Sequence, residues 1–310
     1  MAEKTLSKME KDLLLNIADL HKVPDGAYSL RVNGELVGKQ SSANITIEKK
    51  TDRPGIDIYI AAGTKNESMH IPVILSETGI TETVYNDFYI GEDADVVIVA
   101  GCGIHNCGTE MSEHSGIHAF YVGKNAKIKY VEKHYGEGDG NGKTVMNPTT
   151  VCVLEEGSYL EMETAQIKGV DSTRRDTRAT LGDRATLVVH EKIMTHGDQF
   201  AETNFTVDLN GEGCGAHVVS RSVAKDRSRQ SFVSQINGNN RSSGHTECDA
   251  IIMDDAQVVA VPRIEANHVE AALIHEAAIG KIAGEQLIKL MTLGLTEKEA
   301  EEEIINGFLK

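Results

Sequence analysis

Tryptophan is absent from the 310-residue chain, and other aromatic residues are few, with six phenylalanines and eight tyrosines. Enzymes that cleave carbohydrate place paired carboxylates in a groove, and aromatic faces that stack on sugar rings usually line such grooves. The scarcity of aromatic rings disfavours a carbohydrate lyase or hydrolase.

Basic residues are also in short supply. There are 31 Lys and Arg against 47 Asp and Glu, which gives a net charge of −16. Nucleic-acid binding needs a basic face for phosphate contacts, and anionic membranes attract basic segments. We therefore expect neither a nucleic-acid partner nor a membrane partner.

Long apolar runs are missing as well. No segment approaches the ~18 apolar residues of a membrane-spanning helix. The first residues, Met1–Lys4, open a charged stretch without the apolar core of a signal peptide. The overall content of 40% hydrophobic and 25% charged residues is that of an ordinary globular protein, and we expect it in the cytoplasm.

Cysteine is sparse and its count is odd, which argues against a disulfide framework. The five are Cys102, Cys107, Cys152, Cys214 and Cys248. In a reducing compartment each is a packing residue, a nucleophile or a metal ligand.

Common catalytic motifs are lacking, including G-x-S-x-G, H-E-x-x-H and C-x-x-C. The glycine-rich stretch 136–144 resembles a phosphate-binding loop but has Glu137 where that motif needs glycine. We predict a flexible loop there.

A short helix and a long β-region account for most of the chain. Apolar residues recur at helical spacing from Leu6 to Leu20, and Pro24 and Gly26 end that pattern. From Tyr28 onward short alternating runs predict strands, and Asn33-Gly34 predicts a hairpin turn.

The β-region carries a loose repeat, in which a turn, a small residue and a β-run recur. The small residues are Ala94, Ala126, Ser158, Ala185, Ala216 and Ala256. A period near 30 residues indicates stacked coils. We predict a mainly β protein with a right-handed β-helix (solenoid) core, and a β-sandwich is the competing fold.

The composition changes after Pro262. Residues 271–293 are rich in helix formers, and Thr296 begins a capping box that predicts a final helix. We expect an N-terminal helical segment over 1–25, the β-helix over 26–264 and a C-terminal helical subdomain over 265–310. The helix pair either caps the solenoid or docks a partner.

Candidate ligands fall in two places. Cys102, His105 and Cys107 form the densest local group of thiols and imidazoles, which suits zinc or iron, with packing as the alternative. Cys248 lies among polar neighbours, and the pair His275-Glu276 offers further donors or a plain surface.

The C-terminal residues resemble the SufB/SufD family. His275-Glu276-Ala277 with Lys281-Ile282, then Gln286-Leu287, Gly294-Leu295 and Gly307-Phe308, follow the family's H-E-A-T-x-x-K-I, Q-L, G-L and G-F pattern. Thr246-Glu247-Cys248-Asp249 looks like the T-Q-C-D segment around the essential cysteine of SufB. The chain looks like a short member, without the longer N-terminal part of SufB.

The resemblance implies a non-enzymatic scaffold for iron–sulfur cluster assembly. By it, Cys248 accepts sulfur, and Cys248, Glu276 and His275 ligate a transient cluster; a flavin is a further cofactor of the family. Expected partners are a SufC-type ABC ATPase on the C-terminal helices, a sulfur donor protein, and a second copy or SufB/SufD paralogue across a dimer interface. A SufD-like structural subunit without its own cluster ligand is the alternative.

Overall fold

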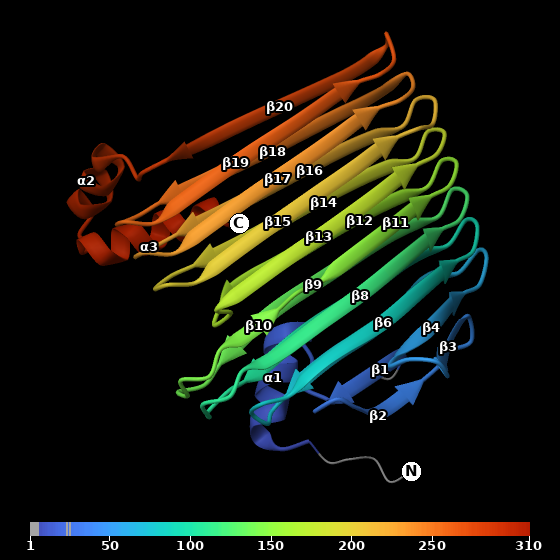
Figure 1. Ribbon diagram of the computed structural model, residues 1–310, viewed down its shortest axis with the longest axis horizontal. Helices are drawn as coiled ribbons and strands as arrows, with labels where there is room; N and C mark the ends of the chain where they lie inside the picture. The colour runs from blue at the N-terminus through green and yellow to red at the C-terminus, as the bar shows by residue number, and fades with distance from the viewer. Residues whose placement is uncertain (1–5, 23, 25) are drawn as a thin grey trace.

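Two ten-stranded β-sheets form the body of the computed structural model, which describes residues 6–22, 24 and 26–310. The chain alternates between the sheets, so neighbouring strands of a sheet are one coil apart in sequence and almost all pairs are parallel. Figure 1 shows the coils stacked in chain order. The β-solenoid has about eight turns, which confirms the predicted solenoid over the β-sandwich.

Sheet A consists of β1 (Ala27–Val32), β2 (Glu35–Gln40), β5 (Lys65–Leu75), β7 (Asp95–His105), β9 (Lys127–Glu137), β12 (Tyr159–Lys168), β14 (Thr186–Thr195), β16 (Gly215–Ala224), β18 (Ser242–Ile252) and β20 (Ala271–Gly280). Sheet B consists of β3 (Ile45–Lys49), β4 (Gly55–Ile60), β6 (Thr81–Ile90), β8 (Ser112–Val122), β10 (Thr144–Met146), β11 (Thr149–Leu154), β13 (Ser172–Leu181), β15 (Phe200–Leu209), β17 (Arg229–Gly238) and β19 (Gln257–Ala266). The helices are α1 (Lys8–Ala18), α2 (Gly284–Thr292) and α3 (Glu297–Phe308).

The core lies between the two sheets. Successive side chains of a strand point to opposite faces, so every second residue enters the core. Equivalent inner residues of successive coils then stack on one another. Phe88 and Phe120, paired in register, have ring centroids 4.4 Å apart and nearly parallel planes. One hydrophobic cluster therefore runs along most of the solenoid.

A small residue closes the same turn of several coils, as the repeat predicts. Ala94, Ala126, Ser158 and Ala185 are buried there, each after a residue with positive φ. The next member of this column is Cys214, not Ala216, which lies inside β16. Ala256 closes a turn at the opposite edge of the sheets. This turn position requires a small side chain, and cysteine meets that requirement as alanine does. A repeat defined by alanine therefore overlooks Cys214.

Helix α1 covers the outer face of sheet A near its N-terminal end. Leu13, Leu14 and Ile17 are buried against β5, β7 and β9, in a cluster that also includes apolar side chains of β1. Gly101 permits the close approach, since a Cβ there would lie 2.6 Å from the Ile17 carbonyl oxygen. The predicted helix is confirmed over Lys8–Ala18; residues 1–5, 23 and 25 of the predicted segment 1–25 lie outside the described residues. The predicted hairpin at Asn33 joins β1 and β2.

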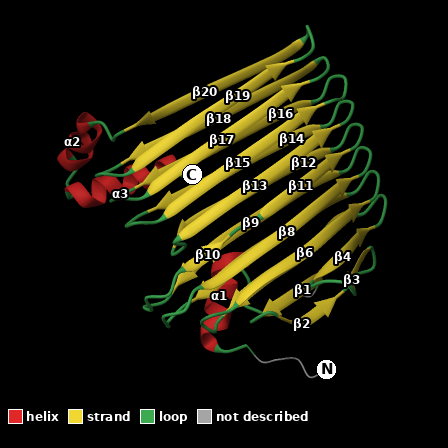
Figure 2. Cartoon of the chain, in the orientation of Figure 1, coloured by secondary structure: helices red, strands yellow, loops and turns green. Residues whose placement is uncertain are grey.

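The helix predicted from residue 271 is wrong in its first half. Residues 271–280 form β20, which pairs in parallel with β18, and α2 begins only at Gly284. The ladder to β18 overrides the helix propensity of an alanine-rich segment. The capping box at Thr296 is present at the start of α3. Figure 2 shows both helices beside the last coils.

Among the described residues, no helix has the length and apolar character needed to cross a bilayer.

Candidate functional site

Cys248 lies on the inner face of β18, one strand from the end of sheet A. Gly244, Thr246 and Cys248 point between the sheets, while His245 and Glu247 point outward. The thiol is 1% exposed. Burial, together with Glu191 and Asp249, raises the pKa of Cys248 to about 12. The thiol is therefore protonated at neutral pH unless a metal ion displaces its proton.

His275 and Glu276 lie on β20 and point to opposite faces of sheet A, because they are consecutive in a strand. His275 pairs with Thr246 on the inner side, and its Nδ1 lies 2.7 Å from the Thr246 hydroxyl oxygen. Burial and the neighbouring His245 lower the pKa of His275. Glu276 pairs with Glu247 on the outer side. Cys248 and His275 thus share a face, and Glu276 does not join them within one chain.

Glu276 instead meets a second set of donors on the outer face. Its Oε2 is 3.5 Å from Nε2 of His245. His245, Glu247 and Glu276 each offer one ligand atom, and these atoms lie within 4.8 Å of one another. Among the residues that the structure describes, this is the group of three His, Cys, Asp or Glu side chains that could hold a metal ion. The His217 ring stacks on that of His245, with centroids 5.0 Å apart.

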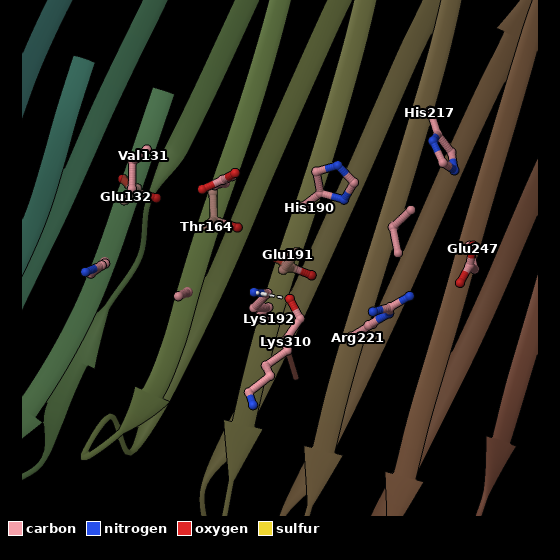
Figure 3. A pocket seen from close by; sticks show the side chains of 14 residues that line it. Val131, Glu132, Thr164, His190, Glu191, Lys192, His217, Arg221, Glu247 and Lys310 are labelled. Carbon is pink, nitrogen blue, oxygen red and sulfur yellow. Dashed lines mark hydrogen bonds between the residues drawn. The ribbon is translucent and has the colours of Figure 1, made fainter. Parts of the chain in front are cut away.

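A groove of about 490 Å³ adjoins this set on the outer face of sheet A (Figure 3). His190, His217, Arg221 and Glu247 line it, and the C-terminal Lys310 reaches into it. The Lys192 ammonium donates a hydrogen bond of 2.9 Å to the Lys310 carbonyl oxygen, which holds the end of the chain against β14.

Polar side chains also form a column on the inner face of sheet A that ends at Cys248. Register pairs place them level with one another on five successive strands: Glu132, Thr164, Glu191, Ser220 and Cys248. All are buried. Such a column in the middle of a core requires partners for each polar group.

Arg175 of β13 supplies partners from sheet B for the two glutamates, whereas the Thr164 hydroxyl has no hydrogen-bond partner. Its Nη1 donates to Glu132 at 2.5 Å, and its Nε lies 3.4 Å from Glu191. Burial opposes ionisation of Glu132, but Arg175 and the adjacent imidazoles hold its pKa well below the usual range. The pKa of Glu191 is raised, because burial outweighs Arg175 and the hydroxyl groups of Ser220 and Thr203.

A chain of hydrogen bonds extends from Glu132 toward the N-terminal coils. The Tyr130 hydroxyl donates to Glu132 at 2.9 Å, and Nδ1 of His118 lies 2.8 Å from that hydroxyl oxygen. Since the single hydroxyl proton is used on Glu132, Nδ1 of His118 is the donor in this pair. Burial lowers the pKa of His118 to about 4.

The structure divides the group Cys102, His105 and Cys107. Cys102 faces the core and is 2% exposed, and burial raises its pKa well above the usual range. Cys107 is exposed, and its Sγ lies 2.9 Å from Nε2 of His105. His105 Nδ1 lies 3.4 Å from Glu137. The three predicted residues therefore do not gather on one site.

Comparison with known proteins identifies the family of this chain. The family model for the SufBD core domain of the SUF system for FeS cluster assembly matches residues 79–308, about three quarters of the chain. The chain belongs to the SufBD family. This confirms the resemblance of the C-terminal segment.

Archaeal SufBD proteins are among the relatives. An iron–sulfur cluster assembly SufBD family protein of Methanothermobacter thermautotrophicus (strain Winter) is 30% identical over 244 residues, which are 76% of this chain and 57% of that protein. Similar proteins of Methanocaldococcus jannaschii and Pyrococcus horikoshii are each 27% identical, over 88% and 94% of this chain and 87% and 84% of theirs. The chain thus spans little more than half the length of the first relative.

Sequence reasoning missed two features of this SufBD chain. It did not single out His245 and Glu247, although they flank Thr246 beside the candidate cysteine. Reading 242–252 and 271–280 as paired strands would have put His245, Glu247 and Glu276 on one face. The inner column around Arg175 left no local signal, because its members are a coil apart in sequence.

The buried His118 predicts a pH-dependent stability. Its pKa is lower in the folded chain (about 4) than the ordinary 6.5, so the unfolded state binds the proton first as pH falls. Stability is then lost between about pH 6.5 and pH 4, by about 3 kcal/mol from this group. In His118→Gln, urea unfolding should show a shallower loss over this window. The exposed His21→Gln is the control, and parallel curves for His118→Gln and the wild type would contradict the assignment.

The cysteines should differ in reactivity toward iodoacetamide. Cys107 is exposed, whereas burial raises the pKa of Cys248 to about 12, which leaves on the order of 10⁻⁵ of it ionised at pH 7. Mass mapping of quenched time points should find Cys107 labelled in the native protein and Cys248 labelled only after unfolding. Cys152, buried with a pKa also raised to about 12, is the matched control. Equal labelling rates for Cys107 and Cys248 would show that the last coil opens freely.

Proposed function

We propose that this chain is a scaffold subunit for iron–sulfur cluster assembly, which builds a transient cluster at the C-terminal end of the solenoid. The observation that carries the proposal is the position of Cys248 beside an uncovered end of the core. Cys248 and His275 face the core from the last two strands of sheet A. Thiolate and imidazole are donors that suit iron.

In the part of the chain that the structure describes, no further strand follows at the C-terminal end of either sheet. β20 and β19 are the outermost strands of sheets A and B. Ile264 and Ile279 are register partners of buried residues on the preceding strands, so they face the inner side of their sheets. They are nevertheless 43% and 39% exposed. Unpaired strand edges and exposed apolar side chains favour pairing with another chain. A second copy or a SufB/SufD paralogue docked here would bury this end.

Such a dimer would also supply the additional protein ligands that an iron–sulfur cluster needs. One chain brings one cysteine and one histidine to the inner face of the last two strands, whereas an iron–sulfur cluster usually takes four protein ligands. A shared interface doubles the donors. We propose that the Cys248 thiolate attacks the outer sulfur of a persulfide on a donor protein, so that the donor's S–S bond breaks, its thiolate leaves, and Cys248 carries the persulfide. Cys248 also ligates iron there, since iron binding lowers the pKa of the thiol.

The chain itself acts as a scaffold and not as an enzyme in this proposal. Helix α2 and its C-cap residue Leu293 expose apolar side chains, with Ile288 at 62%, Met291 at 43% and Leu293 at 80% exposure. An exposed apolar surface on a short helix is suited to docking a partner. We propose a SufC-type ABC ATPase as that partner, and its ATP hydrolysis supplies the movement that opens the dimer end.

Anaerobic reconstitution with ferrous iron and sulfide tests the cluster site. The wild-type chain, with a SufC-type ATPase, should develop visible charge-transfer absorption, and Cys248→Ala should lose most of it. Cys152→Ala is the matched control, because Cys152 is also buried in the core. Absorption that survives Cys248→Ala would favour the SufD-like structural subunit, and dependence on Cys102 or Cys107 would move the site to those cysteines.

The oligomeric state tests the proposed interface. Ile264→Glu places a charge on the uncovered end and should convert the dimer to a monomer in analytical ultracentrifugation. Val153→Glu is the control, since Val153 is similarly exposed, at 39%, but lies on sheet B in the middle of the solenoid. A dimer that tolerates Ile264→Glu, or that Val153→Glu also dissociates, would place the interface elsewhere.

A further inference from the structure

We propose that His245, Glu247 and Glu276 form a ferrous-iron site on the outer face of sheet A, on the side of the sheet opposite Cys248. The inference deepens the proposed function and rests on it for the identity of the metal. In this proposal iron first binds to one histidine and two glutamates, without a thiolate ligand. The last two strands of the sheet, β18 and β20, carry these residues.

The geometry brings the three donors together through strand pairing. Glu247 and Glu276 are register partners on β18 and β20, and His245 precedes Glu247 by two residues on the same face. The three ligand atoms lie within 4.8 Å of one another. Ligands about 2.1 Å from one ion are at most about 4.2 Å apart. Small rotations at the ends of the glutamate side chains therefore suffice to close the site.

Two imidazole nitrogens beside this site lack a hydrogen-bond partner. Nε2 of His245 and Nε2 of His217 are both buried from solvent, and neither makes a hydrogen bond. The Glu276 oxygen at 3.5 Å from His245 is an ionic contact only. A buried nitrogen without a hydrogen-bond partner requires an explanation, and coordination of a metal ion would supply one. The His217 ring stacks on His245 but lies outside the group of three ligands.

The donor set points to iron among the common divalent ions. One imidazole with two carboxylates suits first-row metals such as ferrous iron, whereas magnesium prefers oxygen ligands alone. The local charge also favours a cation. Asp249 lies on the same face as Glu247 and adds a further carboxyl group there, while Arg221 is the nearby basic group.

The arrangement keeps iron and thiol apart until the end of the sheet moves. Glu247 and Cys248 are consecutive in β18 and point to opposite sides of the sheet. β20 is an edge strand held by β18 alone in sheet A. Displacing β20 would release Glu276 from the outer site and His275 from the inner face together. The same strand thereby links iron release to exposure of Cys248.

Anaerobic calorimetry of the full metal-free chain with ferrous iron tests the site at neutral pH, with magnesium in excess. We expect one ion per chain. His245→Ala and the double substitution Glu247→Gln with Glu276→Gln should each weaken binding by at least about tenfold. These side chains are partly or fully exposed, so the fold should persist, which circular dichroism checks. Glu265→Gln, an exposed residue of β19 in the same last coil, should bind as the wild type does.

Three outcomes separate this inference from the proposed function. Unchanged iron affinity in His245→Ala and in the double glutamine variant overturns the site, as does equal displacement by magnesium. Loss of iron binding in Cys248→Ala also overturns it but leaves a cluster scaffold intact. Iron binding that depends on the three residues, without any sulfide-dependent absorption, supports the site and counts against the proposed function.

Discussion

The parallel backbone ladder between successive coils is the interaction on which the rest of the structure depends. Each strand hydrogen-bonds to strands one coil away, so residues some 27 to 32 positions apart become neighbours. The two-residue pleat then decides whether a side chain enters the core or faces solvent. Together these two rules set which residues meet. A shift of one residue in the register of a strand would exchange the inward and outward side chains of that strand.

The same ladder concentrates buried charge in the middle of the solenoid. Glu132 and Glu191 share Arg175, and Tyr130 and His118 extend the network. Ionic groups in such a core cost desolvation energy, and apolar replacements of similar volume are often neutral or stabilising. The column ends at Cys248, so the thiol faces polar neighbours on one side. The raised pKa of Cys248 follows from this placement and from burial.

The last coil has no further coil stacked on it among the described residues. β18 has two neighbouring strands in sheet A, while β20 has one, and the inward residues of β19 and β20 are exposed or only partly buried. Both candidate sites of this SufBD protein are formed by β18 and β20. The donors on β20, His275 on the inner face and Glu276 on the outer face, are therefore held by a strand that pairs with one neighbouring strand and not two. A partner at this end would affect both faces at once.

Local patterns in the sequence determined a large part of this description. The alternation of apolar residues, the recurring small corner residue and the capping box at Thr296 are short-range signals, and the structure confirms the solenoid, the first helix and the last helix. The signature near His275 and Glu276 indicated the SufBD family, to which the chain belongs. These signals survive in sequence because they reflect the geometry of one strand, turn or helix.

Tertiary structure alone decided how the candidate residues are grouped. Residues 271–280 have the composition of a helix, and only pairing with β18 makes them a strand. That change separates His275 from Glu276, joins Glu276 to His245 and Glu247, and leaves Cys248 inside. Likewise, Arg175 meets Glu132 and Glu191 only across the core. The physical reason is that strand register and contacts between sheets arise from packing over tens of residues, which no local pattern records.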